Sequence, residues 1–265
     1  MRFLVWLLTA LLSFLALKAQ TLKHEELSHV ERFNPRLRDA RIERERTAAL
    51  QANPNDPAAL NDRGVARIHL GKFKEAIDDL QRGALLDARS ADLRVSLGYA
   101  LWRSARTAEA AESFREALRL DEKHFPAHYY LGRLLLIGGR DPSEAAAHLQ
   151  RAVEVNPEAY EVRFDLIAAY RALGDATRAR AQLRFLEAEM PAEPRVLYAS
   201  ALLAADREDW KNAIESYRAA LRGDPTLPGA GLELGMALIK SARWTEAAEW
   251  FAQLAKQQPQ AVDPS

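Results

Sequence analysis

The 265-residue sequence contains no cysteine, which excludes disulfide bonds, thiolate chemistry and a lipoprotein attachment cysteine. It also lacks an excess of either charge, because 37 lysines and arginines balance 37 aspartates and glutamates. No run of lysines is present, so nucleic acid is not an expected partner. The composition, 48% hydrophobic and 28% charged, is that of an ordinary globular protein.

Catalytic and metal-binding motifs are missing as well. The sequence has no G-x-S-x-G motif, phosphate-binding loop, dinucleotide fingerprint or paired-acid constellation. The segment HEELSH places His24 and His29 five residues apart, so on a helix they diverge by about 140° and cannot share a metal ion. We therefore expect no enzymatic activity, no cofactor and no metal site.

One long hydrophobic run lies at the N-terminus. Residues 1–19, MRFLVWLLTALLSFLALKA, combine a charged start, an apolar middle and a small residue at a cleavage position after Ala19. This order is typical of a secretory signal peptide. The alternative is a retained membrane anchor, although the run is shorter than the roughly 20 apolar residues that span a bilayer. Under either reading the rest of the chain lies outside the cytoplasm.

An internal repeat organises the rest of the chain. One alanine column recurs at steps of 34 or 35 residues, and glycines and prolines keep the same period. The alanines are Ala76, Ala110, Ala145, Ala179, Ala213 and Ala247. Each period reads as two amphipathic helices joined by a short turn. The small residues predict that the two helices approach closely, while larger neighbours such as Phe114 fill the space beside them.

These residues resemble the tetratricopeptide repeat family, whose unit is a 34-residue helix–turn–helix. Matching positions include Leu97-Gly98, Ala110, Phe114 and Ala117 in one period, and Ala213, Tyr217, Ala220 and Pro225 in another. The resemblance implies an all-α fold, a right-handed superhelical solenoid of antiparallel helix pairs. It also implies an exported, non-enzymatic scaffold that binds a protein or peptide, in the periplasm of a bacterium or anchored facing it.

The periodicity divides the chain into four regions: residues 1–19 as signal peptide or anchor, 20–56 as a helical cap or degenerate repeat, 57–259 as six repeats, and 260–265 as a tail. A helix is expected over residues 37–52. Its charged residues, Arg38, Arg41, Glu43, Arg44 and Glu45, predict a solvated outer face, which a terminal cap needs for solubility.

In the family the first helix of each pair lines a concave side, which implies that two columns of residues face inward. They are Asn61, Val95, Tyr129, Phe164, Tyr198 and Leu232, and Val65, Tyr99, Arg133, Ala168, Leu202 and Met236. From these columns and Trp102 we predict a partner-binding groove lined by Val95, Tyr99, Trp102, Tyr129, Arg133, Phe164, Tyr198, Leu202 and Met236. The alternative is that these side chains only cover one another between repeats.

Trp250 departs from its column, in which the other five residues are Asp79, Ser113, His148, Gln182 and Ser216. We expect it to point to solvent on the last helix, as a docking point or as an incidental exposure. This gives the alternative function, a structural assembly subunit that forms homo-oligomers through its C-terminal helix. Contact with a membrane is expected only if residues 1–19 are retained.

Overall fold

A computed structural model describes residues 34–139 and 141–257 of the chain. The predicted signal peptide or anchor, the HEELSH segment and the C-terminal tail lie outside the described residues. Among the described helices, none is both long enough and apolar enough to cross a membrane.

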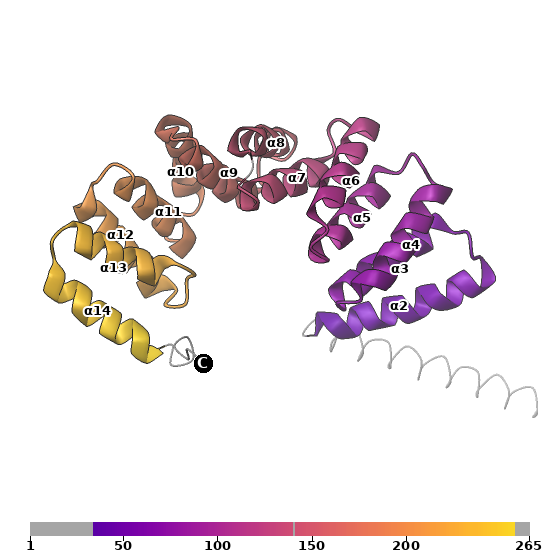
Figure 1. Cartoon of the computed structure of the whole chain (residues 1–265), viewed down its shortest axis with the longest axis horizontal. Helices are drawn as coiled ribbons and strands as arrows, with labels where there is room; N and C mark the ends of the chain where they lie inside the picture. The colour runs from indigo at the N-terminus through magenta and orange to yellow at the C-terminus, as the bar shows by residue number, and fades with distance from the viewer. Residues whose placement is uncertain (1–33, 140, 258–265) are drawn as a thin grey trace, which may run out of the picture. The chain divides into compact units, whose positions relative to one another are not determined.

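The described residues form thirteen α-helices and no strand, which confirms the predicted all-α class (Figure 1). The helices are α2 (Pro35–Ala52), α3 (Pro57–His69), α4 (Phe73–Leu86), α5 (Ala91–Arg103), α6 (Thr107–Leu120), α7 (Phe125–Ile137), α8 (Pro142–Val155), α9 (Tyr160–Ala172), α10 (Ala176–Glu189), α11 (Pro194–Ala205), α12 (Trp210–Gly223), α13 (Ala230–Lys240) and α14 (Trp244–Gln257). After α2 they are arranged as six pairs, α3–α4 to α13–α14, each joined by a short turn.

The chain divides into two compact units. Unit 1 runs to Glu122 and holds α2 and the first two pairs, while unit 2 starts at Lys123 and holds the other four pairs. Several first helices of successive pairs touch: α3 touches α5 in unit 1, and α9 touches α7 and α11 in unit 2. Second helices of successive pairs make no comparable contact among the described residues. The first helices therefore form the inner layer of each stack.

Small residues at the helix crossings make these close approaches possible. All six alanines of the column are 3% exposed or less. A Cβ atom added to Gly98 would lie 2.6 Å from Phe114 Cε1, and one added to Gly132 would lie 2.7 Å from Leu149 Cγ. Such distances are too short for carbon atoms, so only glycine lets these large side chains cross the facing helix.

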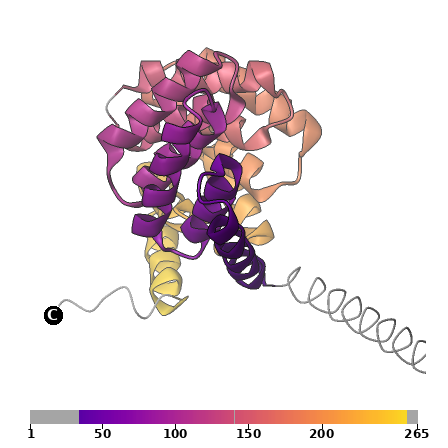
Figure 2. The same ribbon diagram turned by 90° about the vertical axis from the view of Figure 1, so that its right-hand side faces the viewer.

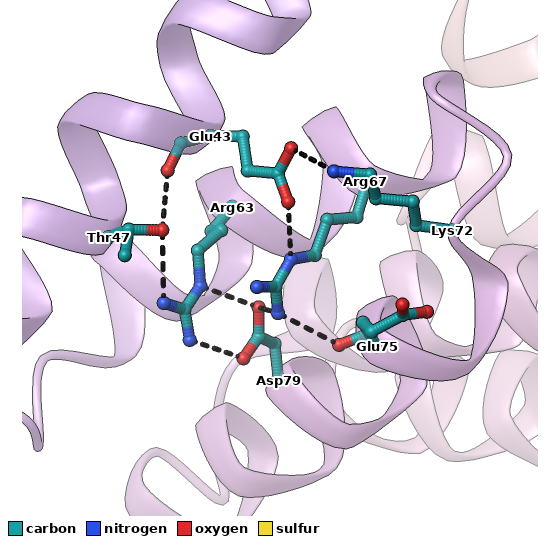
Figure 3. Close-up of polar contacts among 7 residues, drawn as sticks. All are labelled: Glu43, Thr47, Arg63, Arg67, Lys72, Glu75 and Asp79. Carbon is teal, nitrogen blue, oxygen red and sulfur yellow. Dashed lines mark hydrogen bonds and ion pairs between the residues drawn. The ribbon is translucent and has the colours of Figure 1, made fainter.

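Helix α2 covers the start of the repeat array in unit 1, and both views show it side by side with α3 (Figures 1 and 2). Its apolar contribution is small, because Leu50 is its one buried hydrophobic residue and clusters only with Ala59 and Leu60 of α3. Polar contacts hold the rest of the junction (Figure 3).

The centre of this polar network is the buried carboxylate of Asp79 on α4. Arg63 donates to both of its oxygens at 2.7 and 2.8 Å, and Arg67 Nη1 donates to Oδ2 at 2.6 Å (Figure 3). Glu43 of α2 joins the network by accepting from Arg67 at 3.1 Å and from Lys72 at 2.7 Å.

The expected solvated position of Glu43 is therefore wrong, because its side chain is only 16% exposed. Burial alone would raise the pKa of Glu43, but the hydrogen bonds and charges of Lys72 and Arg67 hold it below its ordinary value. Glu43 is thus a charged link between α2 and the first repeat.

Candidate functional site

The nine residues predicted to line a groove lie on the first helices of five repeats. Unit 1 holds Val95, Tyr99 and Trp102 on α5, and unit 2 holds Tyr129 and Arg133 on α7, Phe164 on α9, Tyr198 and Leu202 on α11, and Met236 on α13. All nine therefore belong to helices of the inner layer. We call the six residues of unit 2 its inner face.

In unit 1 the three residues differ in accessibility. Val95 is only 7% exposed, so the expectation that it offers surface to a partner is wrong. Tyr99 and Trp102 are half-buried and meet edge to face, with ring centroids 6.2 Å apart. The Arg103 guanidinium lies over the rings of Tyr99 and Phe73. Part of this aromatic surface is therefore covered by its own neighbours.

In unit 2 the inner face begins with a stack of aromatic rings on α7. Tyr129 stacks on Phe125 with a centroid distance of 6.1 Å, and Arg133 donates to its hydroxyl at 3.1 Å. Burial raises the pKa of the Tyr129 hydroxyl, as does the charge of Asp165, against the opposing effect of Arg133. Tyr129 is therefore a neutral hydrogen-bonding group at physiological pH.

Asp165 on α9 is the electrostatic centre of this part of the face. Its Oδ2 lies 3.3 Å from Arg133 Nε, but the N–H is not aligned for a hydrogen bond with any described residue. Burial raises the pKa of Asp165 to about 6, and Glu161 adds to the shift while Arg133 and Arg195 oppose it. Arg133 is thus held between Tyr129 and Asp165, and its buried Nε–H has no hydrogen-bond acceptor among the described residues.

A pocket of about 270 Å³ opens between α9 and α11, and we call it the α9–α11 pocket. Its lining is mostly apolar and comes from α9, α11 and the loop before α13: Phe164, Ile167, Ala168, Arg171, Arg195, Tyr198, Ala199, Leu202, Leu227 and Pro228. Three predicted residues, Phe164, Tyr198 and Leu202, thus meet in one cavity. Beyond it, Met236 is 48% exposed and Leu232 is 60% exposed on α13.

Two arginines at this pocket are fixed by carboxylates. Arg195 lies 4.2 Å from the centroid of the Phe164 ring and donates to both oxygens of Glu161 at 2.6 and 2.9 Å. This pair lowers the pKa of Glu161. Arg171 is held in the same bidentate way by Asp206, at 2.6 and 2.8 Å. Both guanidinium groups are therefore preorganised beside an apolar cavity.

The sequence-based prediction missed several residues of this site, among them Arg195, Asp165, Leu227 and Pro228. Asp165 directly follows Phe164 in the sequence, but only the approach of α7 to α9 brings it to Arg133. Leu227 and Pro228 belong to the loop before α13, which starts late, at Ala230, after Gly229 in a left-handed conformation (φ +79°). The interruption TLPG was the available signal for this loop.

Trp250 does not point to solvent, so that expectation is wrong. Its indole Nε1 donates to the carbonyl of Gly231 at 2.7 Å, and the half-buried ring packs on the cluster that contains Leu234 and Leu238. In the other repeats, the positions equivalent to Gly231 and Trp250 are occupied by Leu60 and Asp79, Arg94 and Ser113, His128 and His148, Arg163 and Gln182, and Leu197 and Ser216. In this repeat alone, a glycine on the first helix leaves room for a large side chain on the second.

Comparison with known proteins agrees with this architecture. Two family models, each described as tetratricopeptide repeat, match residues 45–92 and 95–142, and residues 136–203 and 204–264. Together they cover most of the chain. The chain belongs to the tetratricopeptide repeat family. Tetratricopeptide repeat proteins are generally scaffolds for protein interaction rather than enzymes.

A curated tetratricopeptide repeat relative is the small glutamine-rich tetratricopeptide repeat-containing protein 2 of Mycosarcoma maydis. It is 32% identical over 73 residues, which are 28% of this chain and 21% of that protein. The match therefore spans about a fifth of the relative's length.

Several solved structures share the tetratricopeptide repeat solenoid fold. YrrB, described as having an unusual peptide-binding site, is 23% identical with a TM-score of 0.60, covering 70% of this chain and 95% of YrrB. PilF of Pseudomonas aeruginosa is 20% identical with a TM-score of 0.63, covering 77% and 93%. A tetratricopeptide repeat protein of Parabacteroides merdae is 16% identical with a TM-score of 0.66, covering 92% and 94%. At these identities the likeness shows the fold.

Proposed function

We propose that this chain is a non-enzymatic scaffold that binds a peptide segment of a partner protein at the inner face of unit 2. The observation that carries the proposal is the α9–α11 pocket, an apolar cavity framed by the half-buried rings of Phe164 and Tyr198. Rigid aromatic side chains around a cavity are the residues that contribute most to measured interface energies. An apolar side chain of the partner would fill the pocket.

The arginines define the polar part of the same partner segment. Arg171 and Arg195 are held in place by carboxylates at the pocket, and Arg133 has a buried N–H that no described residue accepts. Guanidinium groups fixed in this way favour backbone carbonyl or carboxylate oxygens of a bound segment. The proposed ligand is thus an extended or helical segment with apolar anchors and acceptor oxygens beside them.

The proposed location of this activity is based on residues 1–19 alone. Their charged start, apolar middle and small residue at the cleavage position support export, with the scaffold in the periplasm of a bacterium or anchored facing it. Cleavage would be tested by mass spectrometry of the protein purified from cells. The measured mass is compared with the mass calculated for the chain without residues 1–19.

Self-association through the last helix is the second candidate function. One observation supports it: Trp244, at the start of α14, is 62% exposed, so this helix still presents a large apolar side chain. Trp250 contributes less to this candidate because its ring is engaged within its own repeat. Light scattering of the chain and of a Trp244→Glu variant would measure the contribution of this surface.

The peptide-binding proposal is tested with a peptide selected on the immobilised chain from a random peptide library. We expect the double substitution Tyr129→Ala with Phe164→Ala to weaken its binding by about 30-fold or more, since one hot-spot residue contributes about 2 kcal/mol. Fluorescence anisotropy measures the affinity, and circular dichroism measures the fold.

The matched control is Tyr160→Ala. Tyr160 lies on α9, as Phe164 does, but its ring faces Phe185 and does not line the pocket. This control should bind the peptide like the wild type. If the double variant binds every selected peptide with the affinity of the wild type, the proposal is contradicted. Loss of helical structure in the double variant but not in the control also contradicts it, because the two rings then belong to the core.

A further inference from the structure

Helix α10 breaks the residue pattern of the other second helices. The position that directly follows the column alanine is occupied by Ile77, Ala111, Ala146, Ile214 and Ala248 in the other repeats, and the first four of these are buried. In α10 this position is Arg180. A position that is elsewhere small or apolar therefore carries a guanidinium group in this one repeat.

The acidic positions of the repeat are also replaced in α10. Arg178 stands where other second helices have Glu75, Glu109, Glu144, Asn212 and Glu246, and Ala181 stands where they have Asp78, Glu112, Ala147, Glu215 and Glu249. As a result residues 176–186 hold Arg178, Arg180 and Arg184 and no carboxylate. The first three turns of α10 are therefore uniformly basic.

A second cavity of unit 2 lies at this basic segment, and we call it the α10–α11 pocket. Its volume is about 390 Å³, and its lining residues are Ala176, Thr177, Arg180, Ala181, Arg184, Leu203, Asp206 and Arg207. Among residues of the inner face and the α9–α11 pocket, none lines this cavity. The two cavities are therefore separate sites on unit 2.

Two of the positive charges around this cavity have no ion-pair partner within the described part of the chain, while Arg207 lies near the carboxylate of Asp209. Arg180 and Arg184 make no ion pair or side-chain hydrogen bond with any described residue, and Arg207 donates only to the carbonyl oxygen of Leu203, at 3.2 Å. The one carboxylate in the lining, Asp206, has both oxygens bonded to Arg171. The guanidinium groups at this cavity repel each other, and an anion bound between them would reduce that repulsion.

We propose that the α10–α11 pocket binds a phosphate group. Guanidinium groups match phosphate oxygens with paired, charge-assisted hydrogen bonds, and the hydroxyl of Thr177 adds a further donor. A phosphate monoester carries close to two negative charges at neutral pH, which suits the two unpaired guanidinium groups of Arg180 and Arg184 better than a single carboxylate does. The phosphate is that of a free anion or of a lipid headgroup, and the lining of this site shares no residue with the inner face or the α9–α11 pocket.

The test is calorimetric titration of the full chain with inorganic phosphate and with pyrophosphate at low ionic strength. We expect saturable binding at one site that weakens as salt is added. The double substitution Arg180→Ile with Arg184→Gln should lower the affinity at least tenfold. Arg180→Ile introduces the residue that two other repeats have at this position, Ile77 and Ile214, so the fold should be retained.

The matched control is Arg222→Gln, because Arg222 is an exposed arginine of the same unit that also has no ion pair among the described residues. It should bind phosphate like the wild type. Flotation with phosphatidylcholine vesicles containing phosphatidic acid distinguishes a lipid headgroup from a free phosphate. Vesicle binding that requires Arg180 and Arg184 assigns a lipid headgroup. Binding of the soluble anions without vesicle binding assigns a free phosphate. No saturable binding of any probe, or an equal loss in Arg222→Gln, overturns the proposal.

Discussion

Two regions of the molecule bury a helix face with different kinds of contact. One is the junction of α2 with the first repeat in unit 1, and the other is the helix packing around α9 in unit 2. At α9 the contact is a continuous apolar cluster that includes Leu149, Leu166 and Leu183, none of them exposed. At α2 the contact is a network of charged groups around Asp79 and Glu43, with few apolar residues (Figure 3).

This difference predicts that the two regions respond differently to solution conditions. Apolar burial contributes about 25 cal/mol per Å² and is insensitive to the protonation of side chains. A charged network is stable only while each group keeps its partner and its charge. We therefore expect mutation to affect both regions strongly, but acid to weaken the α2 junction selectively.

The largest effect is expected in the apolar region. Leu149→Ala removes a fully buried side chain that fills the space above Gly132, and we expect a loss of about 2–5 kcal/mol in the free energy of unfolding. Urea unfolding measures the loss, and hydrogen exchange should place it in α7 to α9. Arg151→Ala, on the exposed side of the same helix, is the control and should change stability by less than about 0.5 kcal/mol. A comparable loss in this control would show that the comparison is wrong.

In the charged region, Asp79→Ala should cost about 3 kcal/mol, because it leaves two largely buried guanidinium groups without their shared carboxylate. Hydrogen exchange should then rise in α2, α3 and α4 and stay unchanged in α9. Asp78→Ala changes the adjacent, exposed carboxylate and should have little effect. If α2 keeps its protection from hydrogen exchange in the Asp79→Ala variant, the charged network does not hold α2 against the first repeat.

The smallest effect is expected from pH, because the charges of Glu43 and Asp165 contribute to the free energy of unfolding with opposite signs. The pKa of Glu43 is lowered in the folded protein, so its contribution to stability is present above pH 4.5 and is lost as the pH falls. The pKa of Asp165 is raised from 3.8 to about 6, so stability is lost as the pH rises through this interval.

At pH 7, Glu43→Gln should therefore be less stable than the wild type and Asp165→Asn more stable, and both differences should be smaller at pH 3.5. Urea midpoints from tryptophan fluorescence at the two pH values measure these differences. Shifts of the same sign in the two variants would remove the electrostatic distinction between the regions.

Much of the fold could be predicted from the sequence because it depends on local periodicity. The alanine column is buried as expected, and Gly98 lies against Phe114 because the repeat places them at a crossing. Capping residues also act locally: Asp56 and Asp141 accept hydrogen bonds from the first backbone N–H groups of α3 and α8. Such features need only neighbours a few residues away.

The site could be predicted only in part. The columns placed Phe164, Tyr198 and Leu202 on one layer of helices, and the structure brings them to one pocket. The columns failed for Val95, which is buried, and for Trp250, whose indole fills the space above Gly231. The position of a residue in the repeat predicts which side of a helix it occupies, but not how far away the facing helix lies.

The sequence by itself determined the number of helices per repeat, the positions where they cross and the faces that are buried, since all of these follow from spacing along one chain. The tertiary structure decided which side chains become partners. Glu43 meets Arg67, Asp165 meets Arg133, and Arg180 lies at a cavity without an ion-pair partner among the described residues. These arrangements depend on distances between helices, and the first two join residues that are 24 and 32 positions apart in the chain.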